Sequence, residues 1–342
     1  MRGWFKAFQI SCTYIGTMVG AGFASGQEIL QFFTRFGGTA VWTIGLASAL
    51  FVWIGTKQML LAHRTGSATY EDLNRLLFGE RFGRYVTFLM TAVLFGTVGV
   101  MLAGAGSIFS EHLHLPYQLG LIATAGLAYG LLRSGMRGIL AINTITVPMM
   151  LIFIGITVWV GLQSPNAGNW LTIPNRIDPL KVWIAPFLYV AMNMCLAQAI
   201  LVPIGHSVRD SRTIRLAGIM GGLGIGLLLI AAHFALSAQM PGIGRYEIPM
   251  AILIHRLGPV VHSLFLIVIY SEIFTTLIAD AFGLTHQLGR RLPALEPIML
   301  PAILAIGYAV SLIGFSNLVS TLYPLFGMMS IGWLVMLMLR RA

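Results

Sequence analysis

Long apolar segments alternate with short stretches rich in charged, proline, glycine and asparagine residues along the whole chain. A helix that crosses the hydrocarbon core of a bilayer needs about 20 apolar residues. Cutting the chain at its polar stretches leaves ten segments of roughly that length, which we place at 8–33, 40–62, 82–112, 117–132, 138–163, 182–206, 212–239, 259–289, 297–314 and 316–339. The pattern therefore predicts an all-α membrane protein with about ten transmembrane helices.

Composition and charge support this interpretation. Of the 342 residues, 57% are hydrophobic and 9% are charged, whereas a soluble domain carries about 25% charged residues. With the N-terminus inside, the outer connections hold Arg35, Arg176, Lys181, Arg245 and Arg256, and the inner connections hold the other 16 of the 21 Lys and Arg residues. Inner loops of membrane proteins carry such an excess. We therefore predict a bacterial-type cell (inner) membrane protein with both termini cytoplasmic and no nucleic-acid partner.

Ten helices divide into two groups of five. Because five is odd, the second group enters the membrane with opposite polarity, which is the arrangement of an inverted repeat. The third segments of the two halves, 82–112 and 259–289, are the longest of their halves, which fits this division. We predict one integral membrane domain made of two inverted five-helix repeats, residues 1–165 and 182–342.

The first segment carries a glycine run, Gly20-Ala21-Gly22, near its centre. Glycine inside a helix costs about 1 kcal/mol relative to alanine, so the run predicts either a broken helix or close helix packing. In a broken helix, free N–H groups of the outer half would face a solute carboxylate. The carbonyls of Gly16 and Val19 would suit a small cation. Phe23, with methionines nearby, would form an apolar pocket wall.

Two later segments carry polar residues at a similar depth. Asn193 lies near the centre of the sixth, beside the apolar Met192, and both are candidates for substrate binding. Symmetry predicts a second break there, although Asn193 could equally bond to a neighbouring helix. In the eighth, Glu272, Thr275 and Thr276 share one helix face. Their oxygens suit Na⁺; the alternative is that both hydroxyls bond back to the preceding turn. Residues 246–257 are predicted to form a short outer helix that covers the site.

The segment Ile15-Gly-Thr-Met-Val-Gly-Ala-Gly-Phe23 resembles the first-helix motif of the amino acid–polyamine–organocation (APC) superfamily, whose members share the LeuT fold. Its continuation, Ala24-Ser-Gly-Gln-Glu28, is similar to YkvI-type membrane permeases. The resemblance implies a LeuT-like 5+5 inverted repeat with broken helices 1 and 6. It also implies substrate binding around Gly20, with the N–H groups of Ala21 and Gly22 holding a carboxylate.

The same resemblance implies one sodium site, made by Gly16, Val19, Glu272, Thr275 and Thr276. Phe23 stands where sodium-coupled relatives of LeuT have an asparagine for a second ion, so a second site is not expected. Proton-coupled members can carry a lysine at the sodium position in the fifth segment. Segment 138–163 has no lysine, and this favours Na⁺ over H⁺ as the coupling ion.

These observations predict a Na⁺-coupled secondary transporter of an amino acid or a similar small carboxylate-bearing solute, working by alternating access. Proton coupling and a non-transporting membrane ligand sensor are the alternatives. Glu28 and His233 are candidates for a proton relay or gate, and His233 could instead make an ordinary bond between helices. No metal-ligand spacing, phosphate loop or nucleophile elbow is present, so neither enzyme activity nor an organic cofactor is expected. The oligomeric state stays open.

Overall fold

The fold is known from a computed structural model, which describes residues 2–134, 137–291 and 296–340. Helices make up all the regular structure of these residues. In chain order they are α1 (Arg2–Met18), α2 (Ala21–Ser25), α3 (Gln27–Phe32), η1 (Thr34–Thr39), α4 (Ala40–Thr65), α5 (Tyr70–Ser107), η2 (Ile108–His112), α6 (Tyr117–Ser134), α7 (Arg137–Leu162), α8 (Asn169–Thr172), α9 (Pro179–Ser207), α10 (Ser211–Ser237), η3 (Gly242–Arg245), α11 (Pro249–His255), α12 (Pro259–Arg291), α13 (Glu296–Ser311) and α14 (Phe315–Leu339).

The described helices match the ten predicted segments. Six helical stretches are long and apolar enough to cross a membrane: Thr34–Thr65, Phe88–His112, Pro179–Ser207, Ser211–Ser237, Pro259–Thr285 and Phe315–Leu339. Three shorter apolar stretches are Tyr117–Leu132, Pro148–Leu162 and Ile298–Ser311. The first predicted segment is present as the chain of short helices from α1 to α3. The prediction of an all-α protein with about ten such helices is confirmed.

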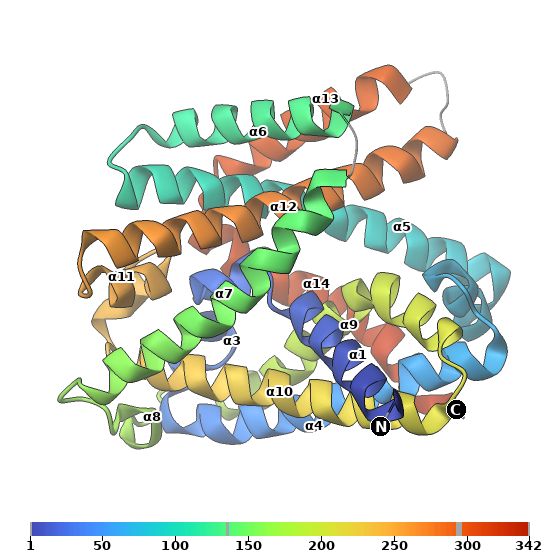
Figure 1. The fold of residues 1–342 in the computed structure, drawn as a ribbon, viewed down its shortest axis with the longest axis horizontal. Helices are drawn as coiled ribbons and strands as arrows, with labels where there is room; N and C mark the ends of the chain where they lie inside the picture. Colours follow the sequence, from blue (N-terminus) through green and yellow to red (C-terminus); the bar gives the residue numbers. More distant parts are fainter. Residues whose placement is uncertain (1, 135–136, 292–295, 341–342) are drawn as a thin grey trace.

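The helices pack as two groups that meet around the first segment (Figure 1). One group joins α4, α10, α9 and α1, because α4 packs against both α10 and α9 while α1 packs against α10. The other group joins α5, α12, α13 and α6. In Figure 1 α7 crosses obliquely in front of both groups. This arrangement places α2 and α3 in the interior, between long helices from distant parts of the chain.

If the two predicted repeats correspond segment by segment, the equivalent helices are α1 and α9, α4 and α10, α5 and α12, α6 and α13, and α7 and α14. Several helix–helix contacts then occur twice, once in each of two equivalent pairs. The contact of α4 with α9 corresponds to that of α10 with α1. In the same way, α5 with α6 corresponds to α12 with α13, and α5 with α14 corresponds to α12 with α7. A two-fold relation between the halves would produce such pairs. The division at residues 1–165 and 182–342 itself stays a prediction.

Glycines set the close approach of α4 to its neighbours. A Cβ added at Gly205 of α9 would lie 2.3 Å from the carbonyl oxygen of Met59, and one added at Gly222 of α10 would lie 2.4 Å from the backbone nitrogen of Val52. Small residues let membrane helices pack backbone against backbone. These two glycines therefore fix α9 and α10 against α4.

The predicted break in the sixth membrane helix is wrong. α9 runs from Pro179 to Ser207 as one helix and continues through Asn193. The segment has no glycine run, and its alanine, leucine and methionine residues favour a helix. The Asn193 side chain donates from Nδ2 to the Tyr189 carbonyl oxygen at 2.9 Å. Its amide is therefore satisfied without unwinding the backbone.

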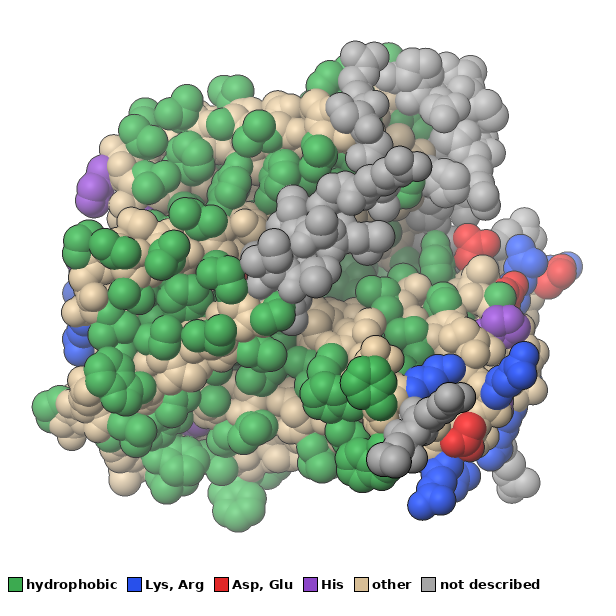
Figure 2. Space-filling view, viewed as in Figure 1, with side chains coloured by type: hydrophobic (Ala, Val, Ile, Leu, Met, Phe, Trp, Pro, Cys, Tyr) green, Lys and Arg blue, Asp and Glu red, His purple; other side chains and the backbone are tan. Residues whose placement is uncertain are grey.

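The surface is suited to lipid. Bulky apolar side chains such as Trp42, Phe88 and Leu227 are 65–73% exposed. In Figure 2 hydrophobic side chains cover the middle of the face, whereas Lys and Arg gather at its right-hand edge. Both chain ends lie toward that side in Figure 1. The charged edge fits the predicted cytoplasmic side, although the orientation in the membrane stays a prediction.

Candidate functional site at the interrupted first helix

The first membrane helix is interrupted at Val19 and Gly20. α1 ends at Met18, Gly20 has extended backbone with φ −103° and ψ −171°, and α2 begins at Ala21. The sequence predicted unwinding over Gly20–Gly22, so the observed break begins earlier and is complete by Ala21. A Cβ added at Gly20 would meet no atom within 4 Å. The direction in which a Gly20 side chain would point is therefore unobstructed.

Backbone groups on both sides of the break lack helical partners. Val19 N–H still donates to Ile15 O at 2.9 Å, but among the described residues no backbone bond joins Gly20 N–H to the Gly16 carbonyl. On the outer side, the first bond of α2 runs from Ala24 N–H to Gly20 O at 2.9 Å. Carbonyls and N–H groups are thus both available here, as expected at two helix ends.

A second bend follows at Gly26, whose φ of +83° lies in the left-handed region that glycine adopts without strain. Its N–H donates to Phe23 O at 3.0 Å, which closes α2. A Cβ at Gly26 would also lie 2.8 Å from Cγ of Met250 in α11. The bend changes the direction of the chain between α2 and α3.

This bend places the Glu28 side chain directly on Gly22. A Cβ added at Gly22 would lie 1.9 Å from Glu28 Oε1, 2.5 Å from Cδ and 2.7 Å from Cγ. Only the missing side chain of Gly22 leaves room for the carboxylate. Glu28 is 7% exposed, and none of the described Lys, Arg or His side chains forms an ion pair with it. A buried carboxylate therefore lies beside the break.

Two tyrosines from other helices surround this carboxylate. Tyr189 of α9 lies within hydrogen-bonding reach of Glu28, and Tyr323 of α14 lies close enough to interact with it electrostatically. The Tyr189 ring is held by the rings of Phe32 and Phe33, at centroid distances of 5.3 and 5.1 Å. Neither tyrosine was predicted from the sequence to face Glu28. Their depth in apolar segments was the available signal, but it does not reveal which residue they face.

Of the five residues predicted for the sodium site, Glu272, Thr275 and Thr276 lie on α12, which packs against α2. Gly16 and Val19 lie in the last turn of α1 and just after it. Thr275 and Thr276 both donate to the Glu272 carbonyl oxygen, at 3.2 and 2.8 Å. These are the bonds to the preceding turn that the sequence left as the alternative. A carbonyl has two acceptor positions, so Glu272 O is already fully used. The two hydroxyl oxygens keep lone pairs that could face a cation.

The same helix carries two further acids. Glu272 is 4% exposed, and its Oε1 has no hydrogen-bond partner among the described residues. Asp280 lies within hydrogen-bonding reach of Thr97 in α5 and interacts electrostatically with Tyr323. Tyr323 therefore lies between the acid on α3 and an acid on α12. Neither Glu272 nor Asp280 pairs with a described basic side chain.

The other predicted residues fall into two kinds. Phe23 and Met192 are 1% and 3% exposed and pack in the core around the break. His233 instead joins helices away from it: Nδ1 lies 3.1 Å from the Thr34 hydroxyl, and Nε2 lies 3.2 Å from the carbonyl oxygen of Trp170. Both ring nitrogens thus have partners, which matches the interhelical alternative.

One side of the break is covered by α11, a short helix inside the range 246–257 for which the sequence predicts one; that this side faces outward stays a prediction. α11 packs against α2, α7, α10 and α12. The Glu111 carboxylate accepts from the N–H groups of Glu247 and Ile248 at 2.9 and 3.3 Å, and Ser107 donates to the Glu247 carboxylate. These bonds fasten the segment before α11 to the C-terminal end of α5 and to η2.

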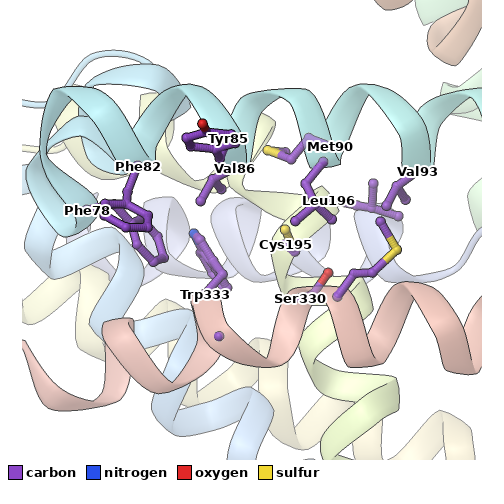
Figure 3. A pocket seen from close by; sticks show the side chains of 13 residues that line it. Phe78, Phe82, Tyr85, Val86, Met90, Val93, Cys195, Leu196, Ser330 and Trp333 are labelled. Carbon is purple, nitrogen blue, oxygen red and sulfur yellow. The ribbon is translucent and has the colours of Figure 1, made fainter.

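A separate pocket of about 210 Å³ lies between α5, α9 and α14 (Figure 3). Phe82, Tyr85 and Trp333 form one end, and Cys195 and Ser330 lie deeper in the wall. Apart from these few polar atoms the lining is apolar, and none of the residues at the break contributes to it. It is therefore not the site that the interrupted helix creates.

Comparisons with known proteins agree with this architecture. No family model matches the chain. It is 35% identical over 340 residues to an uncharacterized membrane protein, YkvI, of Bacillus subtilis (strain 168), covering 98% of this chain and 96% of that one. It is 25% identical over 336 residues to the uncharacterized protein YyaD of the same strain, covering 98% and 97%.

Among solved structures, the inward facing conformation of Mhp1 aligns with a TM-score of 0.63 at 12% identity, covering 95% of this chain and 73% of that chain. At such low identity the match establishes the fold, which is of the LeuT type. The extent and identity of the match to YkvI establish the family. The chain therefore belongs to the family of the membrane protein YkvI and folds as a LeuT-type bundle of about ten helices.

Proposed function

We propose that this protein is a secondary transporter that carries a small organic solute by alternating access, with the solute bound at the break between α1 and α2. The observation that carries this proposal is the interrupted first helix, which leaves backbone groups without helical partners in the middle of a LeuT-type bundle. Lipid-buried backbone must be hydrogen-bonded unless it faces a cavity. An interruption at this depth is therefore expected to serve a ligand.

The expected solute is an amino acid or a similar small molecule. Phe23 and Met192 supply an apolar wall, and the polar groups near the break come from the backbone and from Glu28. Such a mixture of apolar walls and few placed polar groups is typical of small-molecule sites. The closed cover of α11 over α2 fits a state in which the outer path is shut.

Sodium is the first candidate for the coupling ion. Its ligands would be the carbonyl oxygens of Gly16 and Val19 with the hydroxyl oxygens of Thr275 and Thr276, while the Glu272 carbonyl would orient the two hydroxyls. A second candidate is the proton, and the buried Glu272 favours it because its Oε1 has no partner among the described residues. Intramembrane carboxylates of this kind are typical of proton relays.

Uptake into liposomes tests the proposal. The purified protein would be reconstituted and assayed for counterflow of radiolabelled amino acids, with Na⁺ or choline outside and with or without a pH gradient. Sodium coupling requires that uptake depend on Na⁺ and that Thr275→Ala with Thr276→Ala remove this dependence. Proton coupling requires that Glu272→Gln abolish the response to pH. Binding with no flux of any solute would support the sensor alternative.

A further inference from the structure

We propose that Glu28 binds the ammonium group of the solute, so that the substrate is an amine-bearing molecule for which a carboxylate is dispensable. This inference rests on the proposed site at the break in the first helix, and it narrows the chemistry of what binds there. It differs from the expectation drawn from the sequence, in which backbone N–H groups of Ala21 and Gly22 hold a solute carboxylate.

The first argument is the place that Glu28 occupies. Its Oε1 lies 1.9 Å from the position that the Cβ of any other residue at position 22 would take, so the two atoms could not both be there. The protein's own carboxylate therefore covers one side of α2, next to the break. A solute carboxylate at Gly22 would come within a few ångströms of it, and like charges at that distance repel strongly in a low-dielectric interior.

The second argument is the balance of charge. Glu28 and Glu272 are 7% and 4% exposed, and neither lies within ion-pair distance of a described Lys, Arg or His side chain. Asp280, the third acid, also has no described basic partner. A charge in the membrane interior is costly unless it is paired. The described interior thus offers three carboxyl groups and no basic side chain paired with them, so a cationic ligand would supply the missing partner charge.

The third argument is the surrounding chemistry. The Tyr189 hydroxyl lies within hydrogen-bonding reach of Glu28, and Tyr323 lies within electrostatic reach of it. The rings of Phe32, Phe33 and Phe51 hold Tyr189 in place, at centroid distances of 5.1–6.0 Å. A carboxylate beside aromatic rings is suited to ammonium groups, because ring faces attract cations. The free space beside Gly20 leaves room for the approach.

Binding measured with matched probes tests this proposal. The panel is the twenty common amino acids, the amine left by removing each carboxylate, and the carboxylate left by removing each amino group. Affinities would be measured on purified wild type, Glu28→Gln, Glu28→Asp and the exposed control Glu71→Gln, with Na⁺ and with choline. Circular dichroism and monodisperse elution would establish that each variant is folded.

The proposal expects at least one amine and its parent amino acid to bind, and the matched carboxylate not to bind. Glu28→Gln keeps the shape of the side chain and removes its charge, so the affinity for the amine should fall at least about tenfold. Glu28→Asp should keep the selectivity for amines, and Glu71→Gln should match wild type. The proposal is overturned if amine-free carboxylates bind as well, if Glu28→Gln leaves amine affinity unchanged, or if no probe binds.

Transport separates this proposal from the proposed function. If an amine binds through Glu28 but is not moved across liposomes, the amine site stands and the carrier function fails. If liposomes accumulate a solute that has no amine, the carrier function stands and the amine site fails.

Discussion

Replacing Gly22 by alanine should force the Glu28 carboxylate out of its place. The new Cβ would lie 1.9 Å from Oε1 and 2.7 Å from Cγ, whereas real Cβ contacts are essentially never shorter than 3.0 Å. The carboxylate therefore has to move by about 1 Å or more within a buried site. Overpacking of this kind costs about 1–3 kcal/mol, against a gain of about 0.5–1 kcal/mol from the higher helix propensity of alanine. We expect Gly22→Ala to lower the free energy of unfolding.

A double-mutant cycle with Glu28→Ala isolates this contact. In the Glu28→Ala background the clash is gone, so Gly22→Ala should be neutral or stabilising, with a coupling energy of about 1–3 kcal/mol. Unfolding by sodium dodecyl sulfate in mixed micelles, followed by circular dichroism, gives the four free energies. Gly20→Ala is the matched control, because its Cβ would meet nothing within 4 Å. Equal destabilisation by Gly22→Ala in both backgrounds would refute the reasoning.

Three further predictions concern the scaffold. Gly222→Ala should lower the free energy of unfolding by about 1–3 kcal/mol, because the new Cβ would lie 2.4 Å from the Val52 backbone nitrogen. Gly45→Ala should not lower it, because a Cβ there meets nothing within 4 Å. Unfolding in detergent measures both variants, and equal effects would contradict the prediction. Glu111→Ala removes the acceptor of the N–H groups of Glu247 and Ile248, just before α11. Hydrogen exchange of these two amides should become roughly tenfold faster or more, whereas the exposed control Glu71→Ala should leave it unchanged. Hydrogen bonds from Thr69 lower the pKa of Asp72 in the folded protein. The stability that this helix cap contributes is therefore present above the pKa of Asp in the unfolded chain, about 3.9, and is lost as the pH falls through the lower pKa of the folded state. Thr69→Ala should cost about 1 kcal/mol at pH 7 and less at pH 3, and an unchanged cost at both would contradict the assignment.

The sequence by itself determined the features that depend on local chemistry. A helix in a bilayer must present about 20 apolar residues whatever its neighbours are, so hydropathy predicted the membrane helices. The interruption of the first helix was also predictable, because Gly20 and Gly22 weaken a helix through their own backbone freedom. The break expected at Asn193 is absent, and local chemistry explains this too. It was inferred from symmetry between the halves, and the local sequence of α9 favours a continuous helix.

Only the tertiary structure decided what surrounds the break. Glu28 lies on Gly22 because Gly26 bends the chain at a left-handed φ, and Tyr189 and Tyr323 meet the carboxylate from helices more than 150 positions away in the chain. Hydropathy treats such residues as isolated polar positions in apolar segments. Which of them face each other is set by the packing of separate helices, and the energy of a buried charge depends on those partners. The sequence therefore predicted where the first helix breaks, and the fold decided that a carboxylate stands beside it.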